Sequence, residues 1–208
     1  MKVIFATGNM GKMREIRAIM SDIEAEVLSM KEADVYADVV EDGSTFMENA
    51  FIKARAVAAL AKEKGLDAAV VADDSGLVVD ALGGEPGIYS ARYLGEDTPY
   101  KIKNARIIER LSGVEDEKRS ARFVCAMAIV FPDGSEDSFE ATYEGRIGYE
   151  EKGPNGFGYD PIFYLPDRGL YSAELDPDEK NRISHRGKAL EGIKAIIKEH
   201  EYENLDSE

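Results

Sequence analysis

The sequence predicts an α/β fold, and three patterns point to this class. Lys2 to Ala6 is a short apolar strand, followed by a glycine-containing turn and a helical pattern. Ala68 to Ala72 is a second apolar run, suited to a buried strand. Between residues 121 and 143, apolar residues alternate on both sides of a Pro-Asp-Gly turn, which predicts a long antiparallel hairpin.

The length and the charge of the chain limit its organisation and its partners. The 208 residues suit one domain, or one domain with two lobes. We predict a single domain over residues 1–200 and a frayed acidic tail over 201–208. The net charge of −15 argues against broad nucleic-acid binding, which depends on basic surface. Most of these acids are expected to form a solvated surface.

The cysteine content and the N-terminus predict a cytoplasmic protein. Cys125 is the single cysteine, so an intrachain disulfide is excluded. Met1 and Lys2 lead directly into the short apolar run, without the apolar core of a signal peptide. Because apolar runs stay well below the roughly 18 residues that span a bilayer, we expect no membrane segment.

Four helices are predicted from apolar spacing and capping signals. The strongest signal is a capping box of Thr45 and Glu48, followed by apolar residues at helical spacing as far as Gly65. An earlier helix is expected after the first turn, a third from Thr98-Pro99 to about Leu111, and a last one after Ser184.

Cationic side chains stand at two predicted helix starts, where the helix dipole disfavours them. Lys12 ends the segment Thr7-Gly8-Asn9-Met10-Gly11-Lys12, whose backbone N–H groups would suit a phosphate, although a plain surface lysine is the alternative. The segment lacks the Walker A spacing. His185 and Arg186 follow Ser184 in the same way, so we expect an anionic or carbonyl-rich ligand between the two helix starts.

Carboxylates gather at the end of the second apolar run. Asp73 and Asp74 follow the run directly and precede Ser75-Gly76, which reads as an acidic turn at a strand end. Consecutive strand residues point to opposite sides, so we expect one of the two acids to face a site. With Glu41 and Asp42 they offer hard oxygen ligands that suit Mg²⁺.

Other metal and catalytic chemistries are disfavoured by the residue types present. One cysteine and two histidines, His185 and His200, do not make a usual zinc site. Cys125 lies in a strand-like alternation and is expected to be structural. Ser75 lacks a nucleophile elbow around it. Phe157 and Tyr159, in a glycine-rich loop, offer either a stacking face for a base or plugs in the core.

Six segments in order resemble the inosine triphosphate pyrophosphatase (Ham1-like) family over nearly the whole chain. They are TGNMGKMRE at 7–15, EDGSTFMENAFIKA at 41–54, ADDSGL at 72–77, GEPGIYSARY at 84–93, GFGYDPIF at 156–163 and SHRGKAL at 184–190. Each string alone is weakly specific. The occurrence of all six in this order makes the probability of a chance resemblance very small.

The resemblance implies an elongated mixed sheet with helices packed around it, two lobes enclosing a nucleotide cleft, and a homodimer. It implies Mg²⁺-dependent hydrolysis of ITP, dITP and XTP to the monophosphate and pyrophosphate. Asp74 would be the catalytic base and a metal ligand, with Glu41 as the second metal ligand. The remaining roles concern substrate binding. Thr7 to Lys12, with Ser75, Lys180 and Lys53, would hold the triphosphate, and Phe157, Gly158, Tyr159 and Asp160, with His185 and Arg186, would hold the base.

Two alternatives stay open from the sequence. A Maf-like nucleotide pyrophosphatase has the same general architecture but acts on other nucleotides. A non-catalytic nucleotide-binding module would keep the site without the chemistry. The substrate in each case is a small nucleoside triphosphate, not a nucleic acid or a membrane.

Overall fold

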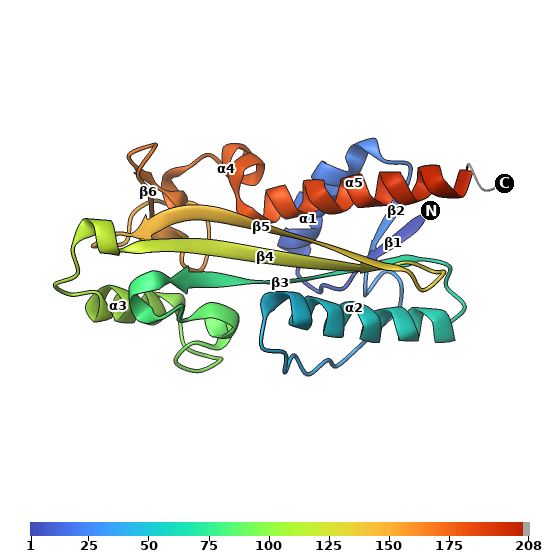
Figure 1. Cartoon of the computed structure of the whole chain (residues 1–208), viewed down its shortest axis with the longest axis horizontal. Coiled ribbons are helices and arrows are strands. Elements are labelled where there is room, and N and C mark those ends of the chain that lie inside the picture. The colour runs from blue at the N-terminus through green and yellow to red at the C-terminus, as the bar shows by residue number, and fades with distance from the viewer. Residues whose placement is uncertain (206–208) are drawn as a thin grey trace. The chain divides into compact units, whose positions relative to one another are not determined.

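The computed structural model describes residues 1–205 and contains the mixed α/β fold that the sequence predicts (Figure 1). Among these residues, seven strands form one mixed sheet in the order β2-β1-β3-β4-β5-β6-β7. The strands are β1 (Lys2–Phe5), β2 (Glu26–Ser29), β3 (Ala69–Val79), β4 (Ser120–Val130), β5 (Glu136–Ile147), β6 (Phe163–Leu165) and β7 (Leu170–Tyr171). The α-helices are α1 (Met10–Ile19), α2 (Phe46–Glu63), α3 (Tyr100–Arg110), α4 (Pro177–Ile183) and α5 (His185–Leu205).

The strand pairing combines parallel and antiparallel neighbours. β1 pairs in parallel with β2 and with β3, in the register Val3↔Val27 and Val3↔Ala69. β6 pairs antiparallel with β5 and with β7. The predicted hairpin is formed by β4 and β5, which are neighbours in the sheet and are joined by the turn from Phe131 to Ser135.

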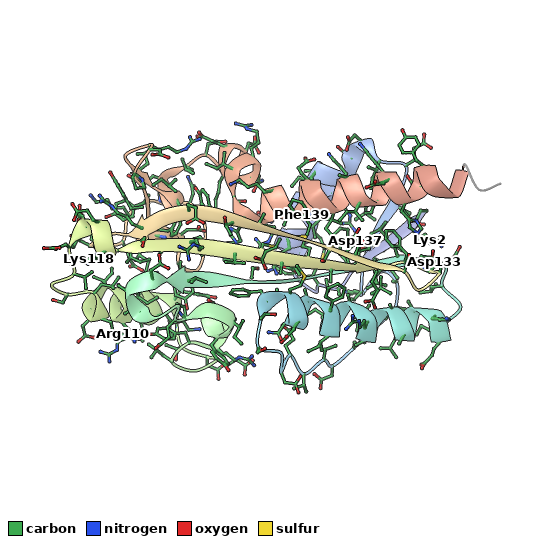
Figure 2. The ribbon with its side chains drawn as sticks, in the orientation of Figure 1. Lys2, Arg110, Lys118, Asp133, Asp137 and Phe139 are labelled. Carbon is green, nitrogen blue, oxygen red and sulfur yellow. The ribbon has the colours of Figure 1, made fainter. Side chains whose placement is uncertain are left out.

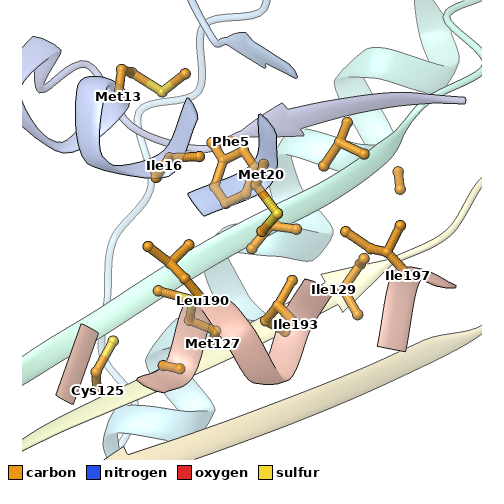
Figure 3. Close-up of a cluster of buried hydrophobic side chains, with 14 of the residues drawn as sticks. Phe5, Met13, Ile16, Met20, Cys125, Met127, Ile129, Leu190, Ile193 and Ile197 are labelled. Atoms are coloured by element: carbon orange, nitrogen blue, oxygen red, sulfur yellow. The ribbon is translucent and has the colours of Figure 1, made fainter. Parts of the chain in front are cut away.

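The chain divides into two compact units. Unit 1 comprises Met1–Asp74, Cys125–Ala141 and Arg186–Glu208, and unit 2 comprises Ser75–Val124 and Thr142–His185. In unit 1, two apolar clusters cover the two faces of the strands. In the first cluster α1 and α5 pack on Val3, Ala69 and Met127, and in the second α2 packs on Ile4, Val70 and Ala128 (Figure 3 shows the first).

Unit 2 has its own core. Leu77 of β3, Phe123 of β4 and Phe163 of β6 form it with Ile107 of α3. Arg119 is fully buried there and donates hydrogen bonds to the backbone carbonyls of Leu111, Ile147 and Gly148. This guanidinium joins the end of α3 to the end of β5.

Several predicted boundaries shift in the structure. α3 begins at Tyr100, with Pro99 as its N-cap, because the Thr98 hydroxyl donates to the carbonyl of Leu94 and does not cap the helix. α5 continues to Leu205, so the chain stays helical beyond Glu201, where we expected the frayed tail to begin. Residues 206–208 of that tail lie outside the described residues.

A glycine accounts for the packing of α5 on β5 within unit 1. A Cβ built at Gly192 would lie 2.3 Å from ring carbons of Phe139, so a larger residue would push the helix away. Figure 2 shows Phe139 beside α5.

No helix within residues 1–205 is both long enough and apolar enough to span a bilayer.

Candidate active site

The acidic segment lies inside a strand and not in a turn. β3 runs without interruption from Ala69 to Val79, so the predicted turn at Asp73 to Gly76 is wrong. Backbone pairing overrode the turn propensity of the Asp-Asp-Ser-Gly sequence. Strand alternation directs Asp73 toward α1 and Asp74 toward α2, as their hydrogen-bond partners show. The expectation that the two acids face opposite sides is confirmed.

On the first face, Asp73 forms a partly buried ion pair with Lys12. The Lys12 ammonium lies 2.8 Å from Asp73 Oδ2, and the two side chains are 25% and 13% exposed. Burial alone would raise the pKa of the Asp73 carboxyl, but the charges of Lys12, Arg186 and Lys53 outweigh it and hold this pKa well below its ordinary value. The Asp73 carboxyl is therefore ionised at neutral pH.

On the second face, Asp74 is held by a buried asparagine. Asn49 is 1% exposed, and its Nδ2 donates to Asp74 Oδ2 at 3.0 Å. Its Oδ1 accepts from the backbone N–H of Gly43 at 2.8 Å. Burial raises the pKa of the Asp74 carboxyl; the Asn49 bond lowers it, and the negative charge of Glu41 raises it again, so the net shift is upward. A carboxylate with a raised pKa suits proton abstraction.

Lys53 contacts both the Glu41 carboxylate and the backbone of Asp73. Its Nζ lies 2.7 Å from Glu41 Oε1 and donates at 3.0 Å to the backbone carbonyl of Asp73. The capped helix α2 therefore supplies both Asn49 and Lys53, one turn apart on one face. The predicted residues Glu41, Lys53 and Asp74 are brought together.

The start of α1 differs in detail from the predicted phosphate cradle. Asn9 caps the helix, and its Oδ1 accepts from the backbone N–H groups of Gly11 and Lys12 at 2.9 and 3.2 Å. The N–H of Asn9 donates to the Thr7 hydroxyl. A Cβ at Gly8 would meet nothing within 4 Å, and the Met10 side chain is exposed. The segment thus presents the Lys12 ammonium and an open surface, while Asn9 already engages two of the expected backbone donors.

The predicted base-binding loop is organised by Asp160, which is 3% exposed. Asp160 Oδ2 accepts from the backbone N–H of Phe157 at 2.9 Å and from Lys180 Nζ at 2.5 Å, and Oδ1 accepts from the Ser172 hydroxyl at 2.9 Å. The Lys180 ammonium also lies 5.2 Å from the centre of the Phe157 ring. Lys180, predicted to assist at the triphosphate, thus lies beside the loop residues.

The two aromatic residues of this loop separate into the two expected classes. Phe157 is 58% exposed and offers an open ring face, whereas Tyr159 is 3% exposed. The Tyr159 hydroxyl donates to the backbone carbonyl of Ser90, and its ring meets Tyr100 edge to face at 5.2 Å. Burial raises the pKa of the Tyr159 phenol above its ordinary range. Tyr159 is therefore a core plug, and Phe157 and Gly158 carry the open part of the loop.

The two residues that begin α5 face different surroundings. The His185 ring stacks on Phe123, with centroids 4.9 Å apart and an interplanar angle of 11°. Arg186 contributes positive charge at Asp73, and its Nη1 lies 3.7 Å from Glu15 Oε2. Ser75 follows Asp74 on β3 as the first residue of unit 2.

The sequence did not reveal the residues that hold these groups. Asn49 lies on the buried face of α2, and the signal was a single amide interrupting an otherwise apolar helical pattern. Gly43 allows the close approach, since a Cβ there would fall 2.7 Å from Asn49 Oδ1. Ser172 gave no recognisable signal.

At Asp74, the negative charges of nearby carboxylates outweigh the positive charge of the nearby lysine. Glu41 and Asp73 both raise the pKa of this carboxyl, which is the electrostatic condition that a cation relieves. Among residues 1–205 there is no cluster of three or more metal-ligating side chains. Two carboxylates suit Mg²⁺, which is commonly held by one or two carboxylates plus substrate phosphates.

The comparisons with known proteins agree with the resemblance. The model of the Ham1 family matches residues 3–196. The chain belongs to the Ham1 family. It is 49% identical to the dITP/XTP pyrophosphatase of Geobacillus kaustophilus, covering 91% of this chain and 90% of that protein. It is 45% identical to the dITP/XTP pyrophosphatase of Exiguobacterium sibiricum, covering 95% and 97%.

Solved structures of Ham1 proteins show the same fold. The HAM1 protein from Coxiella burnetii is 40% identical, with a TM-score of 0.86 over 96% of this chain and 99% of that one. The Staphylococcus aureus Ham1 protein is 39% identical, with a TM-score of 0.85 over 96% and 100%. Membership in the Ham1 family favours the Ham1-like interpretation of the sequence over the Maf-like alternative.

Proposed function

We propose that this chain hydrolyses the non-standard purine nucleoside triphosphates ITP, dITP and XTP to the monophosphate and pyrophosphate, and so removes them from the nucleotide pool. The relatives' names support the reaction and the substrate class. The observation that carries the proposal is the pair of acids on opposite faces of β3, one neutralised by Lys12 and the other held by Asn49 with a raised pKa.

Asp74 is the proposed general base. Its raised pKa increases its basicity, and the Asn49 amide fixes the direction of one carboxylate oxygen. The carboxylate takes a proton from water, and the resulting hydroxide attacks the α-phosphorus while pyrophosphate leaves. A covalent intermediate on the protein is not required.

Glu41 and Asp74 are the proposed ligands of Mg²⁺. The ion, when bound, supplies positive charge against the polyphosphate and lowers the pKa of bound water. Lys53 offsets the Glu41 carboxylate, and this ion pair supports a role in which its ammonium exchanges Glu41 for a phosphate oxygen. Lys12 bears the same relation to Asp73 at the Thr7 to Lys12 segment.

The base is proposed to stack on Phe157, the exposed ring of the glycine-rich loop. Lys180, His185 and Arg186 are the proposed donors near its 6-oxo group. Adenine presents an amino group at that position, so buried donors would lose their acceptors, and this loss discriminates against ATP. The substrate preference thus depends on hydrogen-bond polarity and not on size.

Two further features belong to the proposal. We propose a homodimer, as the family resemblance implies, and light scattering of the purified chain tests it. We also propose a cytoplasmic location, where the nucleoside triphosphate pool lies and where the buried Cys125 thiol is compatible with reducing conditions.

Product analysis in oxygen-18 water tests the reaction type. Attack at the α-phosphorus predicts IMP and pyrophosphate as products from ITP, with the heavy oxygen in IMP. Release of IDP and inorganic phosphate would contradict the proposal. Tight ITP binding without products in Mg²⁺ would instead support the non-catalytic module.

A further inference from the structure

A second buried asparagine, Asn104 on α3, contacts the loop proposed to bind the base. Asn104 is 1% exposed. Its Nδ2 donates to the backbone carbonyl of Gly158 at 3.1 Å and to Glu151 Oε1 at 2.8 Å. Gly158 directly follows Phe157, so this hydrogen bond fixes the peptide plane on the C-terminal side of the exposed ring.

The loop is held at both sides of Phe157. Asp160 accepts from the N–H of Phe157 itself, and Asn104 donates to the carbonyl of the next residue. Gly158 has φ = +65°, a left-handed conformation that allows the backbone to turn here. The next residue, Tyr159, is buried and is held by its hydrogen bond to the backbone carbonyl of Ser90. The Asn104 contact comes from α3 and reaches the open Phe157-Gly158 segment.

The other half of the Asn104 amide is not used. Among the described residues, Asn104 Oδ1 has no hydrogen-bond donor, although the atom is buried. A buried acceptor without a partner reduces stability, and an apolar side chain of similar shape would avoid that loss. The amide is therefore used at this position only through its two N–H donations, one of which reaches the loop at Gly158.

We infer that Asn104 is a positioning residue for base recognition, which holds the Gly158 carbonyl so that Phe157 presents its ring to the nucleobase. The inference rests on the proposed function of the loop. It assigns Asn104 no contact with the triphosphate. The consequence is selective: loss of the amide weakens interactions with the base and leaves those with the phosphates unchanged.

The test compares Asn104→Leu with the wild type, using ligands that separate base from phosphates. We expect the KM for ITP and the dissociation constant of IMP to rise on the order of tenfold, the effect of losing hydrogen bonds that order the loop. The dissociation constant of inorganic tripolyphosphate, which has no base, and kcat should change less than about twofold. The melting temperature should not rise, because the Gly158 carbonyl and the Glu151 carboxylate each lose a donor with the amide.

Two further variants keep the test decisive. Ile107→Val removes one methyl group from the buried face of the same helix and leaves the hydrogen bonds of Asn104 in place, so IMP binding should be unchanged. Asn104→Ala replaces the leucine variant if that one does not fold. Unchanged IMP affinity in a folded Asn104 variant, or an equal loss of tripolyphosphate affinity, overturns the inference.

The proposed function and the inference fail separately. If the wild type releases no pyrophosphate from ITP yet binds IMP, the proposed reaction fails, and IMP affinity still decides the role of Asn104. If the wild type binds neither ITP nor IMP, both are overturned.

Discussion

Asn49 Nδ2 donates to Asp74 Oδ2 at 3.0 Å while Asn49 Oδ1 accepts from the N–H of Gly43 at 2.8 Å, so one buried amide links the proposed base to the segment that carries Glu41. Asn49→Leu removes both bonds at nearly constant volume. We expect kcat for ITP to fall at least about tenfold, because the carboxylate loses its fixed direction. Steady-state kinetics measure this. Glu63→Gln, an exposed residue of the same helix, is the control and should stay within about twofold. Wild-type kcat in a folded Asn49→Leu variant would contradict this role.

Asp74→Asn should reduce turnover at least about a hundredfold with an unchanged fold, because the amide cannot accept the proton. Circular dichroism checks the fold, and pyrophosphate release measures the activity. Asp80→Asn, directly after the end of β3, is the matched control and should keep wild-type turnover. If Asp74→Asn remains active, the base is misassigned and Asp73 is the next candidate.

The Lys12 and Asp73 pair predicts how stability depends on pH. The folded-state pKa of Asp73 lies below its ordinary value of 3.8, so its contribution is complete above that value and is lost as the pH falls below it. Asp73→Asn should lower the free energy of unfolding at pH 7 by on the order of 3 kcal/mol, the loss expected when one partner of a buried pair is removed. The difference from the wild type should shrink below about pH 4.

Urea denaturation at several pH values measures this difference. Glu26→Gln breaks the exposed pair with Lys2, whose atoms lie 3.8 Å apart, and it should cost less than about 1 kcal/mol. A difference for Asp73→Asn that stays constant down to pH 2 would show that the pair does not act through charge.

Arg186→Ala distinguishes a base contact from a phosphate contact. If Arg186 donates to the 6-oxo group, its loss should raise the KM for ITP more than it impairs ATP hydrolysis. The guanidinium also contributes to the low pKa of Asp73, which places positive charge near the Lys12 segment. An equal loss with ITP and ATP would therefore assign Arg186 to the phosphates.

The regular elements followed from local patterns. The capping box at Thr45 located the start of α2, and Thr45 does cap it. Alternation on both sides of Pro132-Asp133-Gly134 located β4 and β5. Both signals are local, since periodicity and capping depend on residues a few positions apart. The Asp-Asp-Ser-Gly segment failed because its pairing with neighbouring strands overrides its turn propensity.

Residues that act through long-range contacts were harder to predict. Asn49 and Asp74 are 25 residues apart, and Asn104 and Gly158 are 54 apart, so their pairing depends on the completed fold. Tyr159 and Phe157 have similar aromatic character in sequence, yet one is buried and the other exposed. Which of two neighbouring aromatic residues is buried depends on tertiary packing and not on residue type.

Initial rates of pyrophosphate release from ITP, dITP, XTP, ATP, dTTP and UTP, with and without Mg²⁺, test the central claim most directly. We predict kcat/KM values for ITP, dITP and XTP at least about a hundredfold above those for ATP, because adenine leaves the 6-oxo donors unpaired. We also predict that activity requires Mg²⁺. Equal rates for ITP, dTTP and UTP, or no pyrophosphate from ITP in Mg²⁺, would contradict the account.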